Sequence, residues 1–131
     1  MENEHTIRDL YEARSRRDWE AVGALFAGDV AWHEPGEEDH SGTFRGRDQV
    51  VALLEKLDQV TEGTFELEPE AFLSLDEYSA VTVRWWAERR GMRSEGREIA
   101  VYRVQDGRIT EVSFFNEPGD QAAFSAVFAF G

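Results

Sequence analysis

Residues 65–116 read FELEPEAFLSLDEYSAVTVRWWAERRGMRSEGREIAVYRVQDGRITEVSFFN, a succession of segments rich in β-branched and aromatic residues. Turn signals separate these segments, and Asp106-Gly107 is a strong signal for a two-residue hairpin. Consecutive strands joined by short turns favour an antiparallel meander. We therefore predict four strands, over residues 65–75, 79–89, 93–105 and 108–116.

The first half of the chain has mainly helical periodicity. Apolar positions recur at helical spacing within residues 6–17, and Tyr11 is on the inward side of this predicted helix. Asp18 can cap a second, short helix that we expect to end at Gly28 and Asp29. After Gly46 a third helix is predicted from an apolar stripe formed by Val50, Leu53, Leu54 and Leu57.

A short strand is predicted between the second and third helices. Residues 30–34 alternate in character and end directly before Pro35, so that Trp32 and Glu34 share one face of the strand. The order is therefore helix, helix, strand, helix and then the meander, which indicates a single α+β domain over residues 1–131. We predict a cone-shaped α+β barrel, with three N-terminal-half helices packed in a strongly curved, mostly antiparallel sheet.

Composition limits the classes of partner. The 27 acidic and 14 basic side chains give a formal charge of -13, which repels nucleic acid and anionic lipid surfaces. The sequence has no cysteine, no apolar run long enough to span a bilayer and no secretory signal, so we expect a cytoplasmic protein. The 16 aromatic residues, nine Phe, four Trp and three Tyr, provide material for an apolar core or the wall of a pocket.

Several short motifs resemble those of the SnoaL-like polyketide cyclases and ketosteroid isomerases, a group within the nuclear transport factor 2-like superfamily. The motifs are LFAGDV at 25–30, WHEP at 32–35, SGT at 41–43 and DGRI at 106–109, and the resemblance extends from about residue 6 to residue 128. It implies a cavity for a hydrophobic small molecule, no cofactor, and a homodimer formed through the outer face of the sheet. Members of this group include isomerases, cyclases, epoxide hydrolases and proteins that only bind a ligand or dimerise.

The resemblance also implies roles for individual residues. Glu34, before Pro35, matches the carboxylate base of the isomerases, and Tyr11 resembles their tyrosine donor to the substrate oxygen. The isomerases have a protonated aspartic acid where this chain has Ala100, which is a departure from steroid isomerisation. The SnoaL-like cyclases use an acid near the end of the last strand, and Glu117 matches that position. The predicted catalytic residues are thus Glu34, Tyr11 and Glu117.

Four aromatic residues are predicted to contact the ligand. An aromatic ring next to a carboxyl group reduces its hydration and raises its pKa towards neutral pH, as general acid–base chemistry requires. The adjacent residues Trp85 and Trp86 must send one ring to each face of the sheet, and one of them can line the pocket. The predicted ligand-binding residues are Trp32, Trp86, Tyr102 and Phe115.

Simpler structural roles compete with these assignments. Glu34 can be a strand-end acid facing water, Glu117 can cap a final helix after Pro118, and Tyr11 can be a core residue. His33 and His40 flank an acidic loop, but their spacing fits no metal-ligand pattern, so no metal site is predicted. Three functions remain open: cofactor-free proton transfer on a carbonyl compound, non-catalytic binding or interaction, and epoxide hydrolysis, whose acid, arginine, acid trio cannot be assigned from the sequence.

Overall fold

The computed structural model describes residues 2–34 and 42–115, which form three helices and a six-stranded sheet. Two helices precede the first strand, and a third follows the second strand. The elements in chain order are α1 Glu2–Ser15, α2 Trp19–Ala24, β1 Phe26–Glu34, β2 Gly42–Arg45, α3 Arg47–Val60, β3 Glu66–Leu75, β4 Tyr78–Arg89, β5 Met92–Gln105 and β6 Arg108–Phe115.

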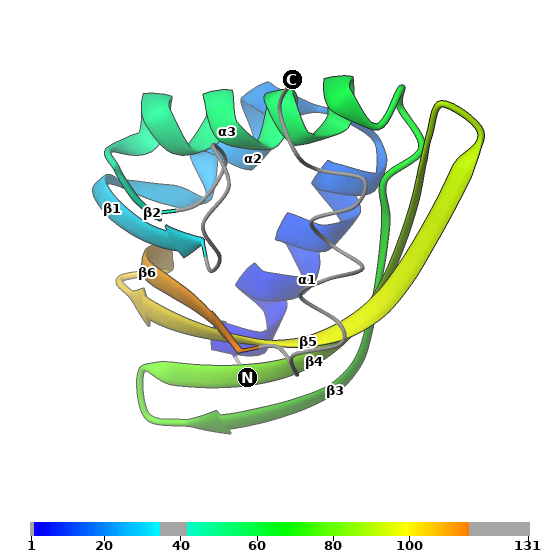
Figure 1. Ribbon diagram of the computed structural model, residues 1–131. Helices are drawn as coiled ribbons and strands as arrows, with labels where there is room; N and C mark the ends of the chain where they lie inside the picture. The colour runs from blue at the N-terminus through cyan, green and yellow to red at the C-terminus, as the bar shows by residue number, and fades with distance from the viewer. Residues whose placement is uncertain (1, 35–41, 116–131) are drawn as a thin grey trace.

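The sheet is mostly antiparallel and strongly curved, as predicted. Its strand order is β2-β1-β6-β5-β4-β3, and only the pair of β1 and β6 is parallel. Figure 1 shows α1 lying on the concave side of the curved sheet, with α3 crossing above it. The protein therefore has the α+β cone architecture, with the helices filling the concavity of one sheet.

The second helix and the first strand have different boundaries from those predicted. Asp18 caps α2 as expected, because its carboxylate accepts a hydrogen bond of 3.1 Å from the backbone N–H of Ala21. However, α2 ends at Ala24, and Phe26 is already the first residue of β1. The prediction of a helix extending to Gly28 was wrong, because Phe26 continues the helical apolar spacing but pairs with Ile109 of β6 instead.

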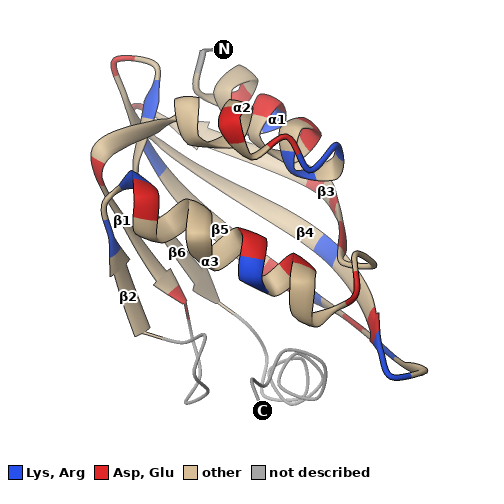
Figure 2. Cartoon of the chain, turned by 90° about the horizontal axis from the view of Figure 1, so that it is seen from above, with Lys and Arg blue, Asp and Glu red and all other residues tan. Residues whose placement is uncertain are grey.

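Residue parity divides strands β4, β5 and β6 between a buried inner face and an outer face. On β5 the inward side chains are those of Glu98, Ala100, Tyr102 and Val104, all buried. Figure 2 shows charged residues on the helices and at the hairpin ends, while the middle of the strands is mostly uncharged. No described helix is long and apolar enough to cross a membrane.

One glycine allows the sheet to contact a large ring. A Cβ atom added to Gly96 of β5 would lie 3.0 Å from the indole nitrogen of Trp85 on the neighbouring strand. Trp85 is 1% exposed, so its ring occupies the space that a side chain at position 96 would need. The inward tryptophan of the pair at 85 and 86 is therefore accommodated by the missing side chain opposite it.

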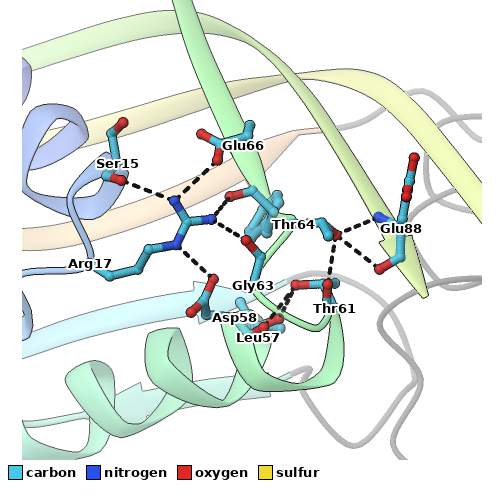
Figure 3. A network of polar contacts seen from close by, with 10 residues as sticks. Ser15, Arg17, Leu57, Asp58, Thr61, Gly63, Thr64, Glu66 and Glu88 are labelled. Carbon is cyan, nitrogen blue, oxygen red and sulfur yellow. Dashed lines mark hydrogen bonds and ion pairs between the residues drawn. The ribbon is translucent and has the colours of Figure 1, made fainter. Parts of the chain in front are cut away.

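Arg17 joins three elements of the fold, α1, α3 and β3. It follows α1 with a left-handed φ of 56°, and its guanidinium lies between α3 and the start of β3. Figure 3 shows the guanidinium bonded to the carboxylates of Asp58 and Glu66, each at 3.1 Å. It also donates to the backbone carbonyls of Ser15, Gly63 and Phe65. We call Arg17 and these five partners the Arg17 clamp.

Candidate functional site

Glu34 is buried at the end of β1 beside Trp32. The two side chains share one face of the strand, and the indole N–H of Trp32 donates a hydrogen bond of 3.0 Å to the Glu34 carboxylate. Glu34 is only 7% exposed, and its burial raises the pKa to about 7. The hydrogen bond from Trp32 and the charge of Arg14 oppose this rise. The carboxyl group is therefore held near the protonation equilibrium at neutral pH.

Glu98 is a second buried carboxyl group that sequence reasoning missed. It lies on the inner face of β5, two residues before Ala100, and is 8% exposed. Its pKa is raised to about 8, mainly by burial and also by the charge of Glu34, while the charge of Arg14 opposes the rise. The signal for Glu98 was period two along β5, since an inward Tyr102 places residues 100 and 98 on the same face. An inward acid thus lies close in sequence to the position where the isomerases have their aspartic acid.

Tyr11 and Tyr102 form a buried hydroxyl pair. Their oxygens are 2.6 Å apart, and their rings meet edge to face with centroids 6.2 Å apart. Burial is the main cause that raises the pKa of each hydroxyl well above its ordinary value. Both groups therefore remain protonated at neutral pH, and one hydroxyl hydrogen of the pair is available for another acceptor.

Arg14 lies in the same interior region as these four groups. Its side chain is 8% exposed, and its guanidinium carbon is 5.8 Å from the ring centre of Trp32 and 5.7 Å from that of Phe65. The charge of Arg14 lowers the pKa of Glu34, Glu98, Tyr11 and Tyr102, so all four groups are within its electrostatic reach. We call these five side chains the buried cluster.

A small cavity adjoins the buried cluster. It has a volume of about 10 Å³ and is lined by Tyr11, Arg14, Leu54 and Phe65 among others. This volume accommodates about one water molecule and is far below that of a ligand pocket. The cavity can therefore hold a water next to a tyrosine hydroxyl and a guanidinium, but not a ligand.

The structure brings together some of the predicted site residues and separates others. Trp32 and Tyr102 lie inside, where Val112 of β6 pairs with both of them in register. Phe115 lies on the outer face and is 60% exposed, so its predicted contact with an interior ligand is not supported by its position. The inward neighbour is Phe114, whose ring centre is 5.0 Å from that of Trp32.

The predicted contact of Trp86 with an interior ligand is also not supported by its position. It lies on the outer face of β4, where Arg84 lies over its ring, while Trp85 points inward. In both pairs of adjacent aromatic residues, composition alone could not tell which ring faces the interior. Glu117 lies outside the described residues.

The histidine that the structure describes beside the acidic loop lies at the surface. His33 contacts the hydroxyl of Thr43 and the carboxylate of Glu111, each at 3.0 Å. Within residues 2–34 and 42–115, no group of three or more His, Asp or Glu side chains could hold a metal ion. His40 lies outside the described residues.

The arrangement can perform acid–base chemistry. Two carboxyl groups in one interior, with pKa values raised to about 7 and about 8, allow one to accept a proton while the other donates one. The tyrosine pair adds a neutral donor to an oxygen that gains negative charge. Aromatic rings around the carboxyl groups favour a hydrophobic ligand.

Comparisons with known proteins agree with this architecture. An uncharacterised protein of Mycobacterium tuberculosis is 34% identical over 122 residues, covering 92% of this chain and 93% of that protein. A protein of unknown function with a cystatin-like fold from Xanthomonas campestris is 27% identical, with a TM-score of 0.90 over 99% of this chain and 100% of the other.

A third similar structure is IdmH of Streptomyces antibioticus, for which polyketide cyclisation has been suggested. It shares 22% identity and a TM-score of 0.78 over 97% of this chain and 100% of the other, and this likeness concerns the fold. The SnoaL-like domain family matches residues 7–112 of this chain. Together with the curved sheet and the helices it encloses, this match shows that the chain belongs to the SnoaL-like family.

Proposed function

We propose that this protein catalyses cofactor-free proton transfer on a hydrophobic carbonyl compound. The single observation that carries the proposal is the pair of buried carboxyl groups, Glu34 and Glu98, whose pKa values are raised to about 7 and about 8. Near neutral pH, ionised Glu34 can act as a base while Glu98 remains mainly protonated. Neither role requires a cofactor.

The proposed reaction begins at the carbon next to the carbonyl. Ionised Glu34 removes a proton from this carbon, and the resulting enolate oxygen accepts a hydrogen bond from protonated Glu98 or from the tyrosine pair. Return of the proton to a different carbon gives isomerisation. Attack of the enolate carbon on a second carbonyl group of the same molecule gives an aldol cyclisation, with protonation of the new alkoxide.

Exchange of hydrogen for deuterium tests the proposal before the natural substrate is identified. Aryl methyl ketones dissolved in D₂O lose their α-hydrogen NMR signal when a base removes the proton reversibly. We expect the wild-type protein to accelerate this exchange, and Glu34→Gln to lose most of the acceleration because its amide cannot accept the proton. Glu88→Gln is the matched control, since Glu88 is an exposed acid on strand β4 of the same sheet.

The non-catalytic alternative predicts a different result in the same experiment. If the ketones bind but none exchanges faster than in buffer, the protein is a ligand-binding module and the assignment of Glu34 as a base is wrong. If no ketone binds or exchanges, an interaction domain with a filled interior becomes the better account. Glu117 remains a second candidate base from the sequence, and Glu117→Gln belongs in the same assay.

Epoxide hydrolysis is a second candidate function, favoured by one specific observation. Arg14 lies within electrostatic reach of both Glu34 and Glu98, which gives an acid, arginine, acid combination, and Arg14 also lines a cavity with room for about one water. One carboxylate would remove a proton from water as its oxygen attacks an epoxide carbon. The protonated carboxyl would then donate its proton to the epoxide oxygen. Formation of a diol from aryl epoxides distinguishes this reaction from enolisation.

We further propose that the protein is a homodimer assembled through the outer face of its sheet. Large apolar side chains are exposed there, with Leu73 75%, Ile99 44% and Phe115 60% accessible. Thr82 pairs with Ile99, which pairs with Phe115, so part of this surface crosses three neighbouring strands. Light scattering should give a dimer for the wild type and a monomer for Ile99→Glu. A monomeric wild type would contradict the proposal.

A further inference from the structure

The guanidinium of Arg14 is buried without a polar partner among the residues that the structure describes. It is 8% exposed, and its contacts there are with the rings of Trp32 and Phe65. A buried guanidinium has five N–H donors, and leaving them unpaired is costly to the folded state. Such an arrangement is retained more readily when the partner comes from outside the chain.

Arg17, three residues later, is a structural arginine whose hydrogen-bond partners can be compared with those of Arg14. Arg17 is less buried, with 27% of its side chain exposed, but it bonds to two carboxylates and three backbone carbonyls. The fold thus supplies a full set of acceptors to one arginine and none among the described residues to the other. Arg14 is also the only buried Lys or Arg side chain in residues 2–34 and 42–115.

The small cavity beside Arg14 offers a position for an oxygen atom. The charge of Arg14 lowers the pKa of four neighbouring groups, those of Glu34, Glu98, Tyr11 and Tyr102. None of these four side chains forms a hydrogen bond with Arg14. The adjoining cavity of about 10 Å³ touches both Tyr11 and Arg14, and Asp58 and Glu66 lie on its wall. An oxygen near this position would meet a cation and a hydroxyl donor at once.

The surrounding rings favour a flat, apolar ligand body. Trp32 contacts Phe26 and Phe114, with ring centres 6.1 Å and 5.0 Å away. Phe65 packs edge to face against Trp85 at 6.4 Å. The guanidinium of Arg14 is therefore a buried cation beside a group of aromatic side chains that pack edge to face or tilted, which suits a ligand with an aromatic body and one anionic end.

We propose that Arg14 binds an anionic oxygen group of the ligand, and that the ligand class is the aromatic or conjugated carboxylic acids. The inference rests on the proposed function in one respect, that the cone interior admits a small molecule. Arg14 forms a two-point contact with the ligand carboxylate, as a guanidinium fork does with a planar oxyanion. The ligand's carbonyl chemistry then occurs beside Glu34 and Glu98.

Binding of an anion next to two acids has a measurable consequence. The negative charge of the ligand favours the protonated forms of Glu34 and Glu98, while the hydroxyls of Tyr11 and Tyr102 are already protonated. Asp58 is held in the Arg17 clamp, as is Glu66, so these two acids remain paired. Association of a carboxylate near pH 7 therefore takes up protons from the buffer, whereas association of a neutral ketone does not.

Matched pairs of ligands test the proposal by calorimetry. The pairs are benzoate with acetophenone, cinnamate with benzalacetone, and naphthoate with acetonaphthone, in which a methyl ketone replaces the carboxylate at similar shape. We expect the wild type to bind at least one carboxylate about tenfold more tightly than its ketone, with uptake of protons detected from the dependence on buffer ionisation enthalpy. Arg14→Gln should lose this preference for the carboxylate over its ketone.

Two further variants separate binding from folding. Arg16→Gln removes an equally charged but exposed arginine and should retain the preference for carboxylates. Arg14→Lys retains the charge without the planar fork and should keep part of the preference, even if Arg14→Gln does not fold. A melting temperature that is unchanged or higher in Arg14→Gln would indicate that Arg14 does not serve stability.

The outcomes for the ligand class and for the proposed function can be told apart. Ketones that bind while no carboxylate binds more tightly would overturn the role of Arg14 and leave the proton-transfer proposal intact. A preference for carboxylates that persists in Arg14→Gln would also overturn it. If neither class binds to the wild type, both the ligand class and the proposed carbonyl chemistry are wrong.

Discussion

The Arg17 clamp and the buried cluster each contain an arginine from the C-terminal part of α1 or just after it, but the two regions differ in how their charged groups are paired. In the clamp, one guanidinium is matched by two carboxylates and three carbonyls, and it joins α1, α3 and β3. In the cluster, two carboxyl groups and a guanidinium are more deeply buried but are only partly hydrogen-bonded. Polar groups that are paired within the fold maintain structure, whereas polar groups buried with too few partners indicate a functional site.

The largest effect is expected when the proposed base is removed from the cluster. Glu34→Gln should reduce the rate of α-hydrogen exchange of a bound ketone by about 100-fold or more, in the range typical of a general base. The glutamine side chain has nearly the same shape as that of Glu34, and its neutral amide avoids the burial of a charge. The melting temperature should therefore not fall. Proton NMR in D₂O measures the rate, and circular dichroism measures the melting temperature. A variant that exchanges as fast as wild type would exclude Glu34 as the base.

The pH dependence of stability is the second test of the cluster. Glu34 and Glu98 have pKa values of about 7 and about 8 in the folded protein, against 4.5 as the ordinary value for a glutamate. The folded state therefore binds more protons than the unfolded state between about pH 4.5 and about pH 8. The stabilising contribution is full below this window and is lost as pH rises through it, on the order of 3 kcal/mol for Glu34 alone.

Urea unfolding at a series of pH values measures this contribution. The double variant Glu34→Gln, Glu98→Gln should have a flatter profile between pH 5 and pH 8, because neither amide titrates. Glu88→Gln, with its exposed side chain, should retain the wild-type slope. A wild-type slope that the double variant leaves unchanged would show that both carboxyl groups titrate as ordinary surface acids.

Removal of Arg17 should have the opposite effect to removal of Glu34. It should lower the stability of the protein without specifically reducing the rate of proton exchange. Arg17→Gln should lower the free energy of unfolding by about 2 kcal/mol, since charged hydrogen bonds are lost at a site that is partly screened by solvent. Arg16→Gln, which loses only a surface pair with Glu12, should change it by less than about 0.5 kcal/mol. Equal effects of the two variants would refute the structural role of the clamp.

The fold could be predicted further from the sequence than the site. Hairpin signals such as Asp106-Gly107 act locally, and both residues have the positive φ that the turn requires, at 53° and 75°. The proximity of Trp32 and Glu34 also followed from period two within one strand, and their hydrogen bond agrees with it. Short-range patterns therefore predicted the three helices and five of the six strands, though not β2, and they identified Glu34 of the acid pair.

The remaining features of the site could not be predicted because they depend on contacts between elements that are distant in the sequence. Glu98 meets the charge of Glu34 only because β6 lies between β1 and β5, and strand order is not contained in a local pattern. Trp86 and Phe115 were assigned to the wrong face because each has an aromatic neighbour, so that both parities look apolar. Arg14 was passed over because an arginine on an amphipathic helix is ordinarily exposed, and its burial arises from the curvature of the sheet around α1.

The most direct test of the central claim is a ¹³C NMR titration of the glutamate side-chain carboxyl carbons, with Glu34→Gln and Glu98→Gln used to assign the two signals. We expect the signal of Glu34 to titrate near pH 7 and that of Glu98 near pH 8, well above the ordinary value of 4.5 for a glutamate. We also expect the titration of Glu98 to move to lower pH in Glu34→Gln, because a neighbouring negative charge is removed. Two signals that titrate independently near pH 4.5 would contradict the buried acid pair, and with it the proposed chemistry.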